Sequence, residues 1–190
     1  MNSQPNTTDS TDADLVTISL GANLPSAYGS PTATLRLAVK SLQDLACGDV
    51  AISSLYCSAA LDCPPGSPDF LNAAVMFRLE PGVTAPELLT RLQLIEAEFG
   101  RQKSATRNAP RSLDLDIIAI GGICLATPRL VLPHPRAHQR AFVLAPVAEL
   151  RPDLVLPGQS QSVQALLGQL PDRGTVKPRQ GPGWEAQAHA

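Results

Sequence analysis

Two acidic residues, Asp114 and Asp116, are separated by a single leucine in the apolar segment 113–120. Because side chains alternate between the two faces of a β-strand, both carboxylates would lie on one face, with their Cα atoms about 7 Å apart. Two like charges at this spacing favour a shared counter-ion, and a hard cation with oxygen ligands is the natural one. An ion pair with Arg107 or Arg111 is the alternative, and the D-x-D spacing alone leaves both open.

Basic residues surround this acidic pair. Between positions 101 and 140 the chain has seven Arg and Lys residues and no other acid, although its net charge is −2. The planar guanidinium of arginine can form two parallel hydrogen bonds to phosphate oxygens. Basic residues beside an acidic pair therefore suit a polyphosphate whose metal ion is bound by the acids. A basic face that contacts only solvent is the alternative. Four of the basic residues lie in the loop that enters the expected strand: Arg101, Lys103, Arg107 and Arg111.

Several common nucleotide and metal motifs are absent from the sequence. It contains neither G-x-x-x-x-G-K-[ST] nor G-x-G-x-x-G, so side chains would have to hold phosphate. His134 and His138 lie outside an H-E-x-x-H context, which makes zinc a poor interpretation. His134 would instead donate a hydrogen bond to phosphate, or serve only as a turn residue.

The composition is typical of a globular protein, because 44% of the 190 residues are hydrophobic and 17% are charged. No apolar run is long enough for a transmembrane helix, and the opening segment MNSQPNTTDSTDAD lacks the features of a secretory signal. The four cysteines form no C-x-x-C pair, which favours free thiols and a cytoplasmic location.

Hydrophobic periodicity predicts one domain over residues 14–170, with a disordered tail at 1–13 and a loose tail at 171–190 that leaves Trp184 outside the core. Residues 21–23 would form a turn, and Thr84 with Glu87 has the capping-box pattern of a helix start. The order of elements, β-α-β-β-α-β with additional C-terminal helices, indicates an α+β, ferredoxin-like α/β sandwich with helices on one face of an antiparallel sheet. The predicted strands are 15–20, 50–57, 71–79 and 113–120, and the predicted helices are 34–46, 84–99, 141–150 and 161–170.

Five blocks, in order and covering about residues 15–150, resemble the 6-hydroxymethyl-7,8-dihydropterin pyrophosphokinase family of the folate pathway. Residues 109–117 (APRSLDLDI) resemble its G-P-R-[ST]-x-D-[LI]-D-[IL] signature, and residues 19–24 (SLGANL) resemble its L-G-[SA]-N-L opening. Residues 70–75 (FLNAAV) resemble its [YF]-x-N-x-[AV]-V strand. The remaining blocks are IE at 95–96 with GR at 100–101, and LPHP at 132–135 with RAFVLAP at 140–146.

The resemblance implies transfer of pyrophosphate from ATP to the hydroxymethyl group of the pterin, with release of AMP and with two Mg²⁺ ions. We expect a monomer whose partners are these small molecules, with no nucleic acid and no membrane. The matching metal ligands are Asp114 and Asp116, and the matching catalytic residues are Arg101, Lys103 and Arg111. The matching ATP-binding residues are Glu96 (also an orienting partner for Arg101), Ile117, Arg129, His134 and Arg140. The matching pterin-binding residues are Ser58, Leu61, Phe70, Asn72 and Phe142.

The residue types at the pterin positions suit that ligand. A pterin is flat and has an edge of hydrogen-bond donors and acceptors, so two aromatic rings and an asparagine amide are suitable chemistry. Core packing of Phe70 and Phe142, and a satisfied strand amide at Asn72, are the alternatives. Loops 58–69 and 101–112 would close over both substrates and exclude water.

Two other classes of function fit the expected fold. A ferredoxin-like nucleic-acid-binding module would use the basic stripe, but such sheets stack bases on exposed aromatic residues, and only 4% of this chain is aromatic. A catalytically silent ligand-binding regulator would have no need of an acid pair that can hold Mg²⁺. The sequence departs from the family pattern at Ala59, Lys103 and Asn108, which bears on loop geometry and rate rather than on the reaction.

Overall fold

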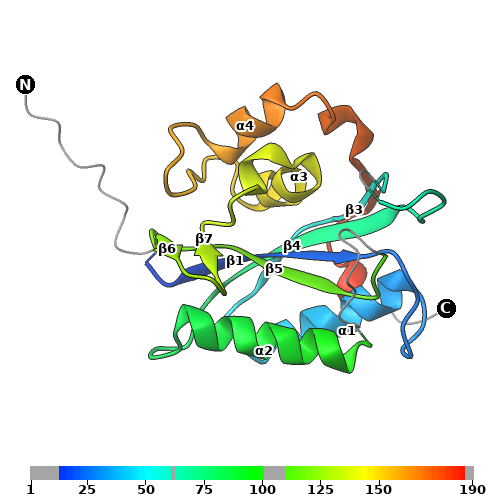
Figure 1. Ribbon diagram of the computed structural model, residues 1–190, viewed down its shortest axis with the longest axis horizontal. Coiled ribbons are helices and arrows are strands. Elements are labelled where there is room, and N and C mark those ends of the chain that lie inside the picture. Colours follow the sequence, from blue (N-terminus) through cyan, green and yellow to red (C-terminus); the bar gives the residue numbers. More distant parts are fainter. Residues whose placement is uncertain (1–12, 61–62, 101–109, 187–190) are drawn as a thin grey trace, which may run out of the picture.

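Short apolar segments alternate with helical ones along the chain. The computed structural model describes residues 13–60, 63–100 and 110–186 (Figure 1). The helices are α1 (Pro31–Gln43), α2 (Ala85–Glu98), α3 (Ala141–Leu150) and α4 (Val163–Gln169). The strands are β1 (Leu15–Ala22), β2 (Ala51–Ile52), β3 (Leu55–Ser58), β4 (Phe70–Arg78), β5 (Asp114–Ile120), β6 (Leu125–Ala126), β7 (Val131–Leu132) and β8 (Lys177–Gln180).

Strand β1 lies inside an antiparallel sheet with the order β5-β1-β4-β3-β8, and the short β2 also pairs with β4. Strands β6 and β7 form a separate two-stranded ribbon. Gly21 and Ala22 belong to β1 and pair with β4, so the prediction that the strand ends before residue 21 is wrong. Because β4 and β5 flank β1, residues far apart in the sequence meet across this strand.

Helices cover both faces of the sheet (Figure 1). Helices α1 and α2 lie on one face, where Leu35 and Leu88 join the buried cluster that contains Ile18. Helices α3 and α4 lie on the other face, where Leu144 packs in a second cluster with Met76. The mixed α and β composition and the antiparallel sheet are therefore confirmed, and the two helices of the β-α-β-β-α-β unit, α1 and α2, share one face as expected. The additional C-terminal helices α3 and α4 cover the opposite face, which the sequence analysis did not assign.

The starts of the helices follow from local sequence. Ser30 Oγ accepts the N–H of Ala33, which satisfies a donor in the first turn of α1. Thr84 and Glu87 form the predicted capping box at α2, since each side chain accepts the other residue's N–H. In the described ranges, none of the helices has the length and hydrophobicity needed to cross a membrane.

The predicted strand 50–57 is interrupted at Ser53 and Ser54, which separate β2 from β3. Ser53 Oγ accepts the N–H of Ala74 at 2.9 Å, and the Glu149 carboxylate on α3 accepts the N–H and the hydroxyl of Ser54. Side-chain acceptors of this kind compete with the ladder and interrupt a strand. Burial, and then the hydrogen bond to Glu149, raise the pKa of the Tyr56 phenol above its usual range.

The C-terminal segment is part of the fold, so the prediction of a loose tail over 171–190 is wrong as far as residue 186, where the described segment ends. Strand β8 pairs with the edge of β3. The Trp184 side chain is fully buried, its Nε1 donates to the carbonyl of Ser53 at 2.8 Å, and Arg36 Nε donates to the carbonyl of Trp184 at 2.8 Å. One aromatic anchor among polar residues produces no periodic pattern, which is why periodicity does not detect it.

Candidate active site

The two acids of β5 lie on the face of the sheet that α3 covers. Leu115 and Ile117 point the other way and are buried in the cluster beneath α1 and α2. The side chains of Asp114 and Asp116 are 24% and 39% exposed, so both remain accessible. The strand alternation that placed the carboxylates on one face is therefore confirmed.

The register of the three neighbouring strands brings the proposed pterin and metal residues together. Gly21 pairs with Asn72 of β4 on one side and with Asp114 of β5 on the other. Two residues along, in the next row that points to the same face, Ser19 pairs with Asp116. Residues directly opposite each other in antiparallel strands point to the same face, so the Asn72 amide and the Asp114 carboxylate flank a position without a side chain.

Arg111 enters β5 beside the acids and forms an ion pair with Asp114, with Nη1 and Oδ2 2.9 Å apart. This is the ion pair that sequence analysis left open as an alternative to a bound cation. The contact also holds a guanidinium next to the carboxylates. A phosphate group bound near Asp114 would therefore meet a cation that is already in place.

His134 is held close to Asp116 by contacts of its main chain and its ring. Its N–H donates to the carbonyl of Ile118 at 2.8 Å, and its Nδ1 accepts the N–H of Arg136 at 3.2 Å. Burial, followed by the charges of Arg140 and Arg136, lowers the pKa of His134 to about 4. The neutral ring therefore carries its proton on Nε2, which lies 4.0 Å from Asp116 Oδ2.

Arg140 lies at the start of α3 and faces the acids. Burial and then Arg136 lower the pKa of its guanidinium, while Asp116 and Asp114 act in the opposite direction. The guanidinium lies over the ring of Phe142, 5.5 Å from its centre. It thus joins the acidic side of the site to an aromatic side chain that is expected to contact the pterin.

Asn72 is buried in β4, and its Nδ2 donates to Ser58 Oγ of β3 at 2.9 Å. The structure therefore brings together two of the predicted pterin residues. One amide hydrogen of Asn72 is used within the protein, as the alternative of a satisfied strand amide foresaw. Phe70 and Phe142 are both half-buried, and Phe142 packs against the second core cluster, as the alternative of core packing expected for that ring.

Glu96 supports the site from α2. Its side chain is 6% exposed, and Oε1 accepts the N–H of Leu115 at 2.8 Å. Leu115 is the residue between the two acids, and β5 lies at one edge of the sheet. Glu96 therefore holds the main chain from which both carboxylates project.

Other predicted residues are not brought into this cluster. The Ile117 side chain is buried in the core, so only its main chain could contact ATP. Arg129 lies in the exposed turn between β6 and β7, beyond the end of β5 that is remote from Asp114. Leu61, Arg101 and Lys103 lie outside the described residues, as does most of the loop 101–112 that was expected to close over the site.

Asn23 is a site residue that the sequence analysis assigned only to a turn. Its side chain is 3% exposed, Oδ1 accepts the N–H of Arg111 at 2.8 Å, and Nδ2 donates to the carbonyl of Pro68 at 3.0 Å. The N–H groups of Asn23 and Leu24 donate to the carbonyl of Arg111. Asn23 thus joins the segment entering β5 to the loop entering β4. The sequence signal that could have identified Asn23 as a site residue was its position in the family-like block SLGANL at 19–24.

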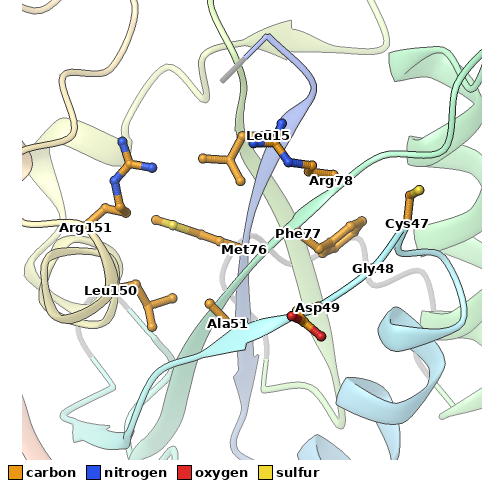
Figure 2. A pocket seen from close by; sticks show the side chains of 10 residues that line it. All are labelled: Leu15, Cys47, Gly48, Asp49, Ala51, Met76, Phe77, Arg78, Leu150 and Arg151. Carbon is orange, nitrogen blue, oxygen red and sulfur yellow. The ribbon is translucent and has the colours of Figure 1, made fainter. Parts of the chain in front are cut away.

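A pocket of about 430 Å³ lies elsewhere in the molecule (Figure 2). Its lining includes Leu15 at the start of β1, Arg78 at the end of β4 and Leu150 at the end of α3. Gly21 and Asn72 lie at the opposite ends of β1 and β4. The pocket therefore belongs to the other end of the sheet and shares no lining residue with the candidate site.

Comparison with known proteins identifies the family. Residues 17–152 match the sequence model described as 7,8-dihydro-6-hydroxymethylpterin-pyrophosphokinase (HPPK). The chain belongs to the HPPK family. It is 37% identical to the 2-amino-4-hydroxy-6-hydroxymethyldihydropteridine pyrophosphokinase of Haemophilus influenzae over 84% of this chain and 95% of that protein. It is 38% identical to the Pseudomonas aeruginosa enzyme of the same name, over 84% of this chain and 93% of that protein.

Solved structures support the same fold. A crystal structure of an HPPK-DHPS in complex with substrates has a TM-score of 0.64 at 11% identity, over 88% of this chain and 48% of that one. The Plasmodium falciparum HPPK-DHPS with pteroate has a TM-score of 0.61 at 10% identity, over 88% and 47%. The chain therefore spans about half of these two-part proteins. This chain has the activity of the HPPK family. It transfers pyrophosphate from ATP to hydroxymethyldihydropterin in folate biosynthesis.

HPPK enzymes use ATP with Mg²⁺, and the residues of this site fit that ion. Asp114 and Asp116 offer hard carboxylate oxygens on one accessible face. The described residues contain no group of three or more His, Cys, Asp and Glu side chains that could enclose a metal by themselves. Mg²⁺ commonly binds through one or two carboxylates and takes further oxygens from phosphate and water, so two aspartates are a suitable donor set.

Proposed function

We propose that this chain carries out the HPPK reaction across the row formed by Asn72, Gly21 and Asp114, with the pterin on the Asn72 side and the triphosphate on the Asp114 side. The observation that supports this most directly is the register, because it places a buried amide and a carboxylate on one face with an open position between them. The β5-β1-β4-β3 order, with α1 and α2 on one face, further supports a ferredoxin-like topology.

On the pterin side, Asn72 and Ser58 form a hydrogen-bonded pair that presents polar atoms to the edge of the heterocycle. Phe70 and Phe142 would contact the two faces of the ring, where stacking favours flat ligands. The Leu61 main chain would add to this contact. Holding the ring in one orientation directs its hydroxymethyl group toward β5.

On the triphosphate side, Arg111, His134 and Arg140 supply hydrogen-bond donors around the acids. We propose that Asp114 and Asp116 hold two Mg²⁺ ions, which neutralise charge on the phosphate oxygens. Arg101 and Lys103 would contribute further positive charge, and Glu96, Ile117 and Arg129 would contact ATP or orient its ligands. Donors fixed before the reaction stabilise the charge that develops during it.

The reaction itself needs one bond to form and one to break. The hydroxymethyl oxygen of the pterin forms a bond to the β-phosphorus of ATP, and the bond between that phosphorus and the oxygen of the α-phosphate breaks, so AMP leaves. The hydroxyl proton is released as the new bond forms. Water must be excluded, because it competes for the same phosphorus.

The test is incubation of the protein with ATP, Mg²⁺ and 6-hydroxymethyl-7,8-dihydropterin. We expect AMP and the pterin diphosphate in equal amounts, and neither product after chelation of Mg²⁺. Formation of ADP instead of AMP would contradict transfer of a pyrophosphoryl group.

We further propose that the enzyme works as a monomer in the cytoplasm. We propose no nucleic-acid partner for it, and no regulatory role in place of catalysis.

A further inference from the structure

Gly21 occupies an internal position of the sheet where the backbone does not require a glycine. It is paired on both sides, with Asn72 and with Asp114, and its φ is not in the left-handed region. Glycine within a strand loses more conformational entropy on folding than other residues and contributes no packing. Its presence in a paired strand often marks a place where a ligand approaches the backbone closely.

A side chain at position 21 would point into the candidate site. A Cβ atom built on Gly21 would lie 3.6 Å from Asn72 Oδ1, 3.9 Å from Phe70 Cδ1 and 3.9 Å from Asp114 Cβ. These distances are ordinary van der Waals contacts, so the folded protein has room for a methyl group. The three nearest atoms all belong to residues proposed to bind the pterin or the metal.

We propose that Gly21 is a specificity-determining residue, whose missing side chain leaves the space through which the pterin hydroxymethyl group reaches the triphosphate. This inference rests on the proposed function. Adjacent strands are about 4.8 Å apart, so Asn72 and Asp114 are separated by about 10 Å across Gly21. A pterin bound at Asn72 and a phosphate bound at Asp114 must meet over this gap.

The pterin should be affected more than ATP by a side chain at this position. The Asn72 amide and the Phe70 ring, which would be two of the three nearest neighbours of the added carbon, both belong to the pterin side. On the acidic side the nearest atom is Asp114 Cβ at 3.9 Å, an ordinary van der Waals contact that does not require the aspartate to move. A methyl group would therefore exclude or displace the pterin while the triphosphate still binds.

The experiment compares Gly21→Ala with Gly122→Ala. Gly122 follows β5, has nothing within 4 Å of an added Cβ and has no left-handed φ, so it controls for the chemical change itself. In Gly21→Ala we expect kcat/KM for the pterin to fall by about tenfold or more, as a single misplaced methyl group can cause. The KM for ATP should stay within about twofold, and Gly122→Ala should match the wild type in both constants. The melting temperature of Gly21→Ala should be unchanged or higher, because alanine loses less backbone entropy.

Each other outcome has a defined meaning. Wild-type kinetics for the pterin in Gly21→Ala would overturn the inference and leave the proposed function intact. Equal losses for both substrates, or a lowered melting temperature, would also overturn it, because the methyl group would then disturb the whole site or the fold. A wild-type protein that released no AMP would remove the proposed function and this inference with it.

Discussion

At the scale of single residues, the site depends on where a few charged groups are held. Asp114 is paired with Arg111, and the N–H of Leu115, the residue that follows it, is fixed by Glu96. These contacts fix the acids before any ligand arrives. Preorganised charges of this kind lose little energy to reorganisation during a reaction.

Replacing either acid should remove most of the activity without unfolding the protein. In Asp114→Ala and Asp116→Ala we expect turnover to fall by roughly a hundredfold or more, since metal bridging supplies several kcal/mol and each 1.36 kcal/mol is about tenfold in rate. The rate of AMP release measures this, with circular dichroism as the check on folding. Asp153→Ala is the control, because that side chain is 81% exposed and lies beyond α3. Near-wild-type AMP release from either site variant would contradict the metal assignment.

His134 should stay neutral at physiological pH in the ligand-free protein. Its pKa is lowered to about 4 from the ordinary 6.5, first by burial and then by Arg140 and Arg136. Between these two values the unfolded chain binds the proton more readily than the folded protein does. The His134 contribution to the free energy of unfolding is therefore complete above about pH 6.5 and is lost as the pH falls toward 4. An NMR titration of the imidazole measures the pKa, with His134→Gln to assign the signal, and a value of 6.5 or above would show that the ring is not buried among cations.

At the scale of elements, local signals were predicted well and distant contacts were not. The capping box at Thr84 and the apolar spacing of α2 depend on neighbours within a few residues, so the sequence indicates them directly. The two hydrogen bonds of the Asn23 side chain join positions 45 and 88 residues away. The burial of Trp184 depends on Ser53, which is 131 residues distant. No window of the sequence contains both partners of such contacts.

The C-terminal anchor should contribute strongly to stability. We expect Trp184→Ala to lower the free energy of unfolding by about 3–5 kcal/mol, the usual cost of removing a buried aromatic side chain. Urea unfolding followed by circular dichroism measures this change. Trp184→Phe should cost less, because it keeps most of the buried ring and loses the hydrogen bond to Ser53. Equal stability of Trp184→Ala and the wild type would mean that the segment 177–186 is not docked in solution.

At the scale of the whole molecule, the sheet separates a structural side from a functional side. The face under α1 and α2 holds the larger apolar cluster, while the face toward α3 has polar and charged residues at the end where Asn72 and Asp114 lie. Alternation along β5 was enough to predict the shared face of the acids. The placement of Gly21 between Asn72 and Asp114 was not predictable from periodicity, because it depends on the pairing of β1 with β4 and β5.

The division of the site into a pterin side and a triphosphate side can be tested by one measurement. Calorimetry would compare Asn72→Ala with the wild type, first with Mg²⁺ and a non-hydrolysable ATP analogue and then with the pterin added to that complex. We expect pterin affinity to fall by about tenfold or more, because loss of the amide leaves polar groups unpaired, while analogue affinity is unchanged. Equal losses for the two ligands would contradict this division and would make Asn72 a structural residue of β4.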